Sequence, residues 1–380
     1  MQQGESQMKN YPIRDLRPGM KIAEPVYTKS GQMLMDVGTV LTSALIDRLS
    51  YYGIDSASAE VPVSIRETPA AEQKAPVSMP NRSRASNPSY SQKVKSQPEF
   101  MAYQIEYTKE VNSIRSLLDG IIQNPAQPPD IGQILNECSR LTSLTKTTVD
   151  LFDKLHNMRL DDDSVYSHCL NVALIARQMG KWLHFSAEDM DVLTLCGLFH
   201  DIGKVQIPDD ILNKPGKYTD EEFALIRQHP VTSYNLLKYL PLDERIKNAA
   251  LMHHERCDGS GYPQKLKADQ IDDFAEIIAI ADVYDAMTAA RSYRSPLCPF
   301  QAIDMFEKDG LQLYSPKYIL TFLNRIANTY QNNRVLLNNG QSANIVMINS
   351  KHLTRPMIQL DDGSVVDMLN LPEWEIIKII

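Results

Sequence analysis

The chain has 380 residues, of which 43% are hydrophobic and 23% are charged, a balance typical of a globular protein with two or three domains. Its net charge of −8 argues against binding to polymeric nucleic acid, although a small anionic substrate is compatible with a site that supplies its own cations. Apolar runs such as residues 275–290 contain acidic residues at helical intervals, and the N-terminus lacks a signal-like apolar core, so we expect a cytoplasmic protein without a membrane span.

Residues 1–62 are predicted to form a small mixed α/β domain. A Pro-Gly turn at 18–19 precedes an extended segment, residues 30–41 have the glycine breaks of a hairpin, and residues 42–54 have the apolar spacing of a short helix. The domain contains no histidine or cysteine. This favours a role in forming a homodimer or contacting a signalling protein over a second active site.

Residues 63–100 are predicted to be a flexible linker. Residues 74–98 hold six serines, four prolines and no acidic residue, a composition that buries too little apolar surface to offset the entropy of ordering. A connecting helix is expected within 101–131, with Ile105, Ile114, Leu117 and Ile121 near one face. The sequence leaves open whether this helix, at about 100–122, pairs with a second copy or packs on its own domain.

Residues 132–332 are predicted to be an all-helical domain, because apolar residues recur at helical spacing and no segment alternates as a strand does. Ser186 and Thr219 are each followed three residues later by an acidic residue, which indicates helix starts. Residues 333–380 alternate short apolar runs with Asn-Gly and Asp-Gly turns and predict a short β-rich C-terminal segment. The predicted fold class is therefore mainly α.

Histidines and aspartates gather at the predicted ends of apolar helices in this domain. They are His168, His200 with Asp201, His229, the adjacent pair His253 and His254, and Asp282 within an apolar run. A single histidine at a helix end is more often solvated or stabilised by the helix dipole. Together they indicate a metal centre, because a carboxylate among apolar neighbours needs a partner of opposite charge.

The donor types narrow the choice of metal. The five cysteines are scattered, without CxxC spacing, while imidazoles with carboxylates suit iron or manganese, with zinc, nickel or cobalt as alternatives. The set is too large for one tetrahedral site but suffices for two metals that share a bridging aspartate and hold a hydroxide for attack on phosphorus. Lys204, Arg291 and Arg294 follow these residues and are candidates for binding phosphate oxygens, although solvated surface cations are the simpler alternative.

The order of these motifs resembles that of the HD-GYP family. Residues 200–204, HDIGK, match HD-x-G-K, and residues 253–263, HHERCDGSGYP, match the complete HHE-x-x-D-G-x-G-Y-P signature. D-x-Y-D-A-M-T follows at 282–288 and R-S-Y-R at 291–294, so the resemblance covers roughly residues 132–330. The N-terminal domain more weakly resembles a small domain that often precedes such modules.

The resemblance implies an all-helical HD-type phosphohydrolase with two or three metals, usually iron. Members of the family hydrolyse the bacterial second messenger cyclic di-GMP to linear pGpG, and in some cases onward to GMP. It also implies the site residues: His168, His200, Asp201 and Asp282 for one metal; bridging Asp201 with His229, His253 and His254 for the second; Lys204, Arg291 and Arg294 for phosphate; and Tyr262 in the loop that shapes the substrate site.

One position departs from the family's pattern. Members with a third metal have a glutamate four residues before the first histidine ligand, where this chain has Ser164. We therefore expect two metals, with the linear dinucleotide as the main product. Two alternatives stay open: hydrolysis of 3'3'-cyclic GMP-AMP, because no residue fixes the second base, and a non-catalytic cyclic-dinucleotide receptor, which would be expected to have lost ligands or Lys204.

Overall fold

The computed structural model divides the chain into two compact units, Met1–Asn87 and Pro88–Ile380. It describes residues 9–60 apart from gaps at 18, 28–32, 42–44, 47–48, 50–53 and 55, and residues 97–380 apart from 125–126, 159–163, 215 and 290–296. Residues 63–96 of the predicted linker and most of the helix predicted at 42–54 lie outside the described residues. The last three residues of the predicted linker, 98–100, belong instead to a helix that begins at Pro98.

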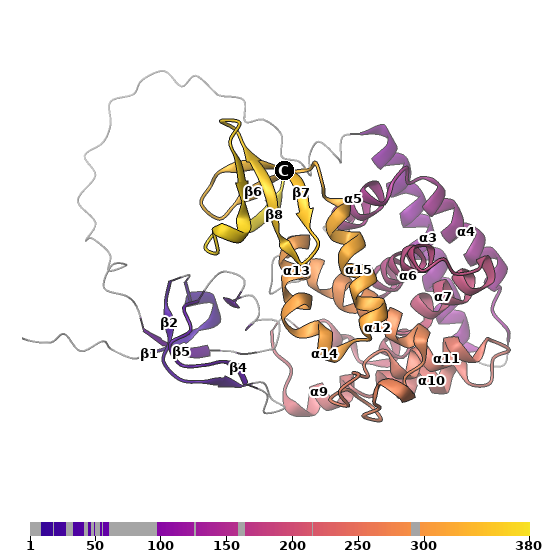
Figure 1. Ribbon diagram of the computed structural model, residues 1–380. Helices are drawn as coiled ribbons and strands as arrows, with labels where there is room; N and C mark the ends of the chain where they lie inside the picture. Colours follow the sequence, from indigo (N-terminus) through magenta and orange to yellow (C-terminus); the bar gives the residue numbers. More distant parts are fainter. Residues whose placement is uncertain are drawn as a thin grey trace, which may run out of the picture. The chain divides into compact units, whose positions relative to one another are not determined.

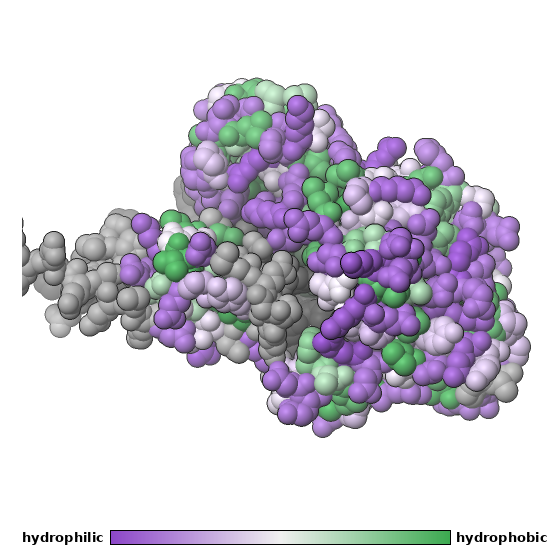
Figure 2. Space-filling model, turned by 60° about the horizontal axis from the view of Figure 1, so that its bottom comes forward, coloured by the Kyte–Doolittle hydropathy of each residue, from purple (hydrophilic) through white to green (hydrophobic). Residues whose placement is uncertain are grey.

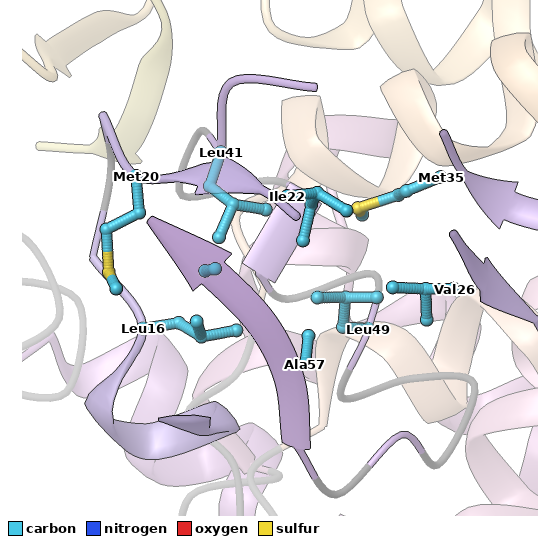
Figure 3. Packing of buried hydrophobic residues seen from close by; sticks show 9 residues of the cluster. Leu16, Met20, Ile22, Val26, Met35, Leu41, Leu49 and Ala57 are labelled. Carbon is cyan, nitrogen blue, oxygen red and sulfur yellow. The ribbon is translucent and has the colours of Figure 1, made fainter. Parts of the chain in front are cut away.

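The N-terminal unit is a small β structure around an apolar core. β1 (Lys9–Pro12), β5 (Ser56–Glu60) and β2 (Lys21–Ile22) form an antiparallel sheet in the order β1-β5-β2, and β3 (Val26–Tyr27) pairs with β4 (Met33–Met35). Figure 3 shows the buried side chains between them, which include Leu16, Met20, Ile22, Val26, Met35, Leu41, Leu49 and Ala57. The hairpin predicted within 30–41 is not found among the described residues of that range: β4 pairs with β3, which precedes it, and Val40 pairs with Lys21.

The second unit is mainly helical, as predicted (Figure 1). Its longer helices are α3 (Pro98–Gln123), α4 (Ile131–Ser143), α5 (Thr148–Met158), α6 (Val165–Trp182), α7 (Ala187–Phe199), α9 (Asp220–Ile226), α10 (His229–Leu237), α11 (Glu244–Met252), α12 (Asp273–Thr288), α13 (Pro299–Met305) and α15 (Pro316–Thr329). Short turns η3 (Ile202–Gln206), α8 (Asp209–Leu212), η4 (Ala268–Gln270), η5 (Phe306–Gly310, a π-helix) and α14 (Leu311–Leu313) join them. α12 is buried along most of its length and packs on α6 and α11, which places it at the centre of the unit.

The first helix of this unit, α3, packs on its own unit rather than being left free. Its buried face carries Phe100, Tyr103 and Tyr107 together with Ile114, and the Tyr107 hydroxyl donates to Asn171 Oδ1 of α6 at 2.7 Å. Ile105, which the sequence placed on the same face as Ile114, is 58% exposed. The aromatic residues also recur at helical spacing, and the larger surface that they bury decides which face turns inward.

The C-terminal segment forms a five-stranded antiparallel sheet. Its order is β10 (Ile376–Ile379), β6 (Arg334–Leu337), β7 (Ser342–Asn349), β8 (His352–Leu360) and β9 (Val365–Asp367). β8 packs on α13 and α15 (Figure 1), and the Glu307 carboxylate in η5 accepts hydrogen bonds from Leu353 N at 3.0 Å and Thr354 Oγ1 at 3.1 Å. The β-rich tail is therefore attached to the helices as part of the same unit.

Hydrophilic and apolar residues are interspersed over the face shown in Figure 2. Among the residues that the structure describes, no helix combines the length and the apolar character needed to cross a bilayer.

Candidate metal centre

The predicted ligands lie at the ends of several helices that converge in the second unit. His168 is in the first turn of α6, His200 caps the C-terminus of α7, Asp201 precedes η3, His229 begins α10, His253 caps the C-terminus of α11 with His254 next to it, and Asp282 lies in α12. The sequence had placed His229 at the end of the preceding helix. Pro230 instead occupies the first turn of α10, where its missing N–H costs no hydrogen bond.

These side chains form three overlapping groups whose donor atoms lie within 4.8 Å of one another. The groups are His168, His200 and Asp282; His200, Asp201 and His253; and His229, His253 and His254. All seven predicted ligands are therefore gathered in one place.

Asp201 lies between the two sides of this cluster. Its Oδ1 is 3.1 Å from His229 Nε2 and 3.6 Å from His253 Nε2. Its Oδ2 is 3.4 Å from both His168 Nε2 and His200 Nε2. Each carboxylate oxygen thus faces a different pair of imidazoles, which is the arrangement required of a carboxylate that bridges two cations.

The burial of these groups fits a bound cation. His200, Asp201 and His253 are 0% exposed, and His200 Nε2 and Asp201 Oδ1 have no hydrogen-bond partner among the described residues. Buried polar atoms are nearly always paired, so two such atoms in one cluster require an explanation. Imidazole nitrogens with carboxylate oxygens are the donor set of iron, manganese and zinc sites, so the residues present fit a metal.

The electrostatics of the cluster favour neutral imidazoles at His229, His253 and His254 beside an ionised Asp201. Burial lowers the pKa of His253 to about 4 and shifts the pKa of His229 and of His254 downward as well. Burial opposes ionisation of Asp201, but nearby Lys204, His200 and His229 hold its pKa well below the ordinary value. Imidazoles that are already neutral at pH 7 can accept a cation without first losing a proton.

His168 differs from His229, His253 and His254 in the direction of its pKa shift. Burial opposes its protonation, but hydrogen bonds to Asp201, Asp282 and Asp285 outweigh that effect and raise the pKa of His168 well above its ordinary value. A cation that binds here must therefore displace a proton from His168, whereas it need not do so at His253.

Lys204 is the predicted phosphate ligand that the structure describes. It lies in η3, one turn after Asp201, and its Nζ is 2.5 Å from Asp201 Oδ2. Gly203, next to it, allows η3 to approach α10, since a Cβ atom at this position would lie 2.4 Å from the His229 carbonyl oxygen. Arg291 and Arg294 lie outside the described residues.

The Gly-Tyr-Pro loop covers one side of the cluster. The Tyr262 ring stacks on His254, with 4.7 Å between the ring centroids, and the Arg227 guanidinium lies 4.5 Å from the centre of the Tyr262 ring. The loop backbone passes so close to the residues before it that a Cβ atom on Gly261 would lie 2.5 Å from Glu255 Cα. Tyr262 is joined to Pro263 by a cis peptide bond.

The comparisons with known proteins agree with this architecture. Residues 134–318 match the family model described as HD domain. The helical unit contains an HD domain. This match agrees with the HD-type helical fold expected from the motifs and is consistent with the resemblance to the HD-GYP family.

Three relatives of the HD domain have names that refer to cyclic dinucleotides. Cyclic di-GMP phosphodiesterase PA4108 of Pseudomonas aeruginosa is 33% identical over 208 residues, which are 54% of this chain and 50% of that protein. A cyclic di-GMP phosphodiesterase of Thermotoga maritima is 35% identical over 164 residues (43% and 45%). The 3'3'-cGAMP-specific phosphodiesterase 1 of Vibrio cholerae is 41% identical over 132 residues (35% and 31%). The chain spans half or less of the length of these relatives.

Two buried acidic residues of the HD domain have contacts that the sequence did not indicate. Glu255 is 2% exposed, and its carboxylate accepts hydrogen bonds from Gln264 N at 2.6 Å and Leu266 N at 2.9 Å, which anchors the Gly-Tyr-Pro loop. Asp285 accepts a hydrogen bond from His168 Nδ1 at 2.9 Å. The sequence could have pointed to them only through the matched motifs, because Glu255 belongs to the motif at 253–263 and Asp285 to the motif at 282–288.

Ser164, at the position of a third-metal glutamate, has a structural role. It is the N-cap of α6, and its Oγ accepts a hydrogen bond from Ser167 N at 3.2 Å. The nearby Asp162 and Asp163 lie outside the described residues.

Proposed function

We propose that this protein is a metal-dependent phosphodiesterase that hydrolyses cyclic di-GMP to linear pGpG. The observation that carries the proposal is the position of Asp201, whose two oxygens face two different pairs of imidazoles. The names of the relatives supply the substrate class. Hydrolysis of a phosphodiester is the reaction to which a pair of close divalent cations is suited.

We propose two divalent cations, iron in preference to manganese. His168, His200 and Asp282 would hold one, His229, His253 and His254 the other, and Asp201 would bridge them. When bound, such a pair activates water and neutralises charge on the phosphate oxygens. The donor set, with imidazoles and carboxylates but no thiolate, supports these metals over soft ones.

The chain's own residues would position the substrate phosphate and exclude water. Lys204 brings a positive charge to the cluster, suited to a non-bridging phosphate oxygen. Arg291 and Arg294 are proposed to add further cationic contacts. Tyr262, held between His254 and Arg227, presents an aromatic ring beside the cluster on which a base or sugar can pack.

The proposed main product is the linear dinucleotide. Ser164 offers a hydroxyl that already caps α6, and a hydroxyl is a poorer ligand for a hard cation than the carboxylate of family members with a third metal. With two metals we expect the first phosphodiester bond to be cleaved much faster than the second.

The second candidate substrate is 3'3'-cyclic GMP-AMP. The V. cholerae relative named for this nucleotide is 41% identical over its matched region. A third candidate, a receptor without activity, is disfavoured because the cluster retains all seven ligands and Lys204.

We propose a cytoplasmic location and a partner surface outside the HD domain. All five cysteines are free, as expected in a reducing compartment. The partner, a second copy or a signalling protein, would bind the N-terminal unit or the outer face of α3, where Met101 and Ile105 are 56% and 58% exposed.

The test is anaerobic purification followed by metal counting and incubation with cyclic di-GMP and 3'3'-cyclic GMP-AMP in parallel, with products separated by chromatography. We expect two metals per chain and pGpG from cyclic di-GMP. Faster cleavage of cyclic GMP-AMP would establish the second candidate. Loaded metals without cleavage of either nucleotide would contradict the proposed activity and favour the receptor.

A further inference from the structure

The His168 imidazole is contacted at both ring nitrogens by carboxylates. Nδ1 donates to Asp285 Oδ2 at 2.9 Å, whereas Nε2 lies 3.1 Å from Asp282 Oδ1 and 3.4 Å from Asp201 Oδ2. Asp282 and Asp285 are three residues apart on α12, so they lie on one face of the helix, and both are buried. Two carboxylates from one turn of α12 therefore contact the two ring nitrogens of His168.

The other histidines of the cluster with a hydrogen-bonded Nδ1 have a different kind of partner. His200 Nδ1 donates to the Gly197 carbonyl at 2.8 Å and His229 Nδ1 to the Ile226 carbonyl at 2.7 Å. His253 Nδ1 lies 3.1 Å from the carbonyls of Ala249 and Ala250. These partners are neutral backbone groups of the preceding helical turn, whereas the partner of His168 is a carboxylate from a helix remote in sequence.

This difference has consequences for the donor strength of each imidazole. Once a cation has displaced the Nε2 proton, Nδ1 keeps its own proton, and a carboxylate that accepts this Nδ1 proton makes Nε2 a stronger donor to the cation than a carbonyl does. The side of the cluster with His168 and His200 also includes Asp282, whose Oδ1 is 3.1 Å from His168 Nε2, whereas its Oδ2 is 3.9 Å from Nδ1 of His254 on the other side. More negative charge therefore surrounds one side of Asp201 than the other.

We propose that Asp285 is a positioning residue that orients His168 through Nδ1 and makes the metal position of His168, His200 and Asp282 the tighter-binding of the two. The inference rests on the proposed two-metal site. Its consequence is an unequal pair of cations, in which the one on the His229, His253 and His254 side exchanges first.

The test is chelator competition on the full-length protein loaded with Zn²⁺, with released and retained metal counted. The wild type should release its two ions in two separate steps. Asp285→Asn should weaken retention of the tighter ion by about 10- to 100-fold, the usual effect of removing such an outer partner, and so merge the two steps. Glu276→Gln is the matched control, because Glu276 is a buried carboxylate on the same helix that contacts Cys257 instead of a histidine.

A second measurement does not depend on a variant that folds. In the Zn²⁺-loaded wild type, ¹⁵N NMR of the histidine side chains should show His168 with a protonated Nδ1 and a metal-bound Nε2. Metal on Nδ1 of His168, single-step release from the wild type, unchanged release from Asp285→Asn, or equal loss from Glu276→Gln would each overturn the inference.

The outcomes separate this inference from the proposed function. Two-step release and the expected Asp285→Asn effect, without hydrolysis of either nucleotide, would support the inference and refute the activity. Hydrolysis with two ions that leave together would support the activity and refute the inference. A wild-type protein that holds no metal would refute both.

Discussion

Two carboxylic acids in the second unit are equally hidden from water and yet differ in charge. Asp201 in the metal centre is 0% exposed, and Glu110 on α3 is 2% exposed. Burial opposes ionisation of Asp201, but Lys204 and the imidazoles around it hold its pKa well below the ordinary value. Burial and the neighbouring carboxylate of Glu137 instead raise the pKa of Glu110 to about 8.

The difference shows that neighbours, and not burial alone, determine whether a buried acid is charged. The arginines on the helices around Glu110 are paired elsewhere: Arg140 with Glu106, and Arg177 with Asp191 at 2.7 Å. Cys138 Sγ, 3.5 Å from Glu110 Oε1, is a weak partner. Asp201 is therefore ionised and suited to a cation, whereas Glu110 keeps its proton at neutral pH.

The largest expected effect, on hydrolysis and metal content, comes from removing the carboxylate of Asp201. Asp201→Ala should abolish hydrolysis, by at least about 10³-fold, and lose at least one metal while the helical fold remains, because the remaining histidines no longer share an anionic bridge. Metal counting, turnover and circular dichroism measure these three quantities. Asp210→Ala, at an exposed aspartate, is the control. Retained activity in metal-replete Asp201→Ala would contradict the two-metal mechanism.

The next effect comes from removing the cation beside Asp201. Lys204→Ala should lower turnover by about 10²- to 10³-fold, the usual loss when one charged contact to the reacting phosphate is removed, with a smaller change in metal content. Turnover and metal counts on the same preparation test this expectation. A site that instead lost its metals would show that Lys204 supports the ligands and not the substrate.

Glu255 is an intermediate case, a buried acid satisfied by backbone N–H groups. Glu255→Ala would leave the N–H groups of Gln264 and Leu266 without their acceptor, at about 1–3 kcal/mol for each. We expect a lower Tm and faster amide exchange in residues 258–266. Glu255→Gln keeps one acceptor oxygen and should lose less, and equal losses for both variants would argue against the anchoring role.

The smallest expected effect is on the pH dependence of stability, and it concerns Glu110, the protonated acid of the comparison. Glu110 keeps its proton up to about pH 8 in the folded chain but releases it near pH 4.5 when unfolded, so folding takes up a proton between these values. Stability should therefore fall as pH rises across this window, by at most about 1.4 kcal/mol per pH unit. Glu110→Gln should flatten this slope in Tm measured from pH 5 to 9.

The groups that face Glu110 define how this experiment is interpreted. They are Glu137, Cys138 and Arg140 on α4, with Arg177 on α6 close to Cys138. Glu99→Gln on the same helix is the control, since Glu99 is exposed and its pKa is lowered. A slope that is the same in wild type and Glu110→Gln would show that another group carries the pH dependence. Hydrolysis at pH 7 should be unaffected.

The sequence predicted the ligands better than the contacts that hold them. The sequence could predict the seven metal ligands because residue type and position at a helix end are local properties. Residue type and spacing alone do not distinguish Asp285 from a solvated helical aspartate, because its partner His168 lies 117 residues earlier in the chain, and only its place in the motif at 282–288 marks it. The orientation of α3 was partly wrong at Ile105, because two faces of that helix carry apolar residues and only tertiary packing selects between them.

The hydrogen bonds of Glu307 to Leu353 and Thr354 tie the C-terminal sheet to the helices, so the chain cannot be cut between them without loss of contacts. Since this carboxylate in η5 holds β8 and the sheet covers α13 and α15, the strands and helices should open together in amide exchange as one cooperative unit. A fragment that ended at residue 332 would expose apolar helix surface and leave Glu307 without its two donors. Excision of the helices alone would therefore be expected to yield an aggregation-prone fragment.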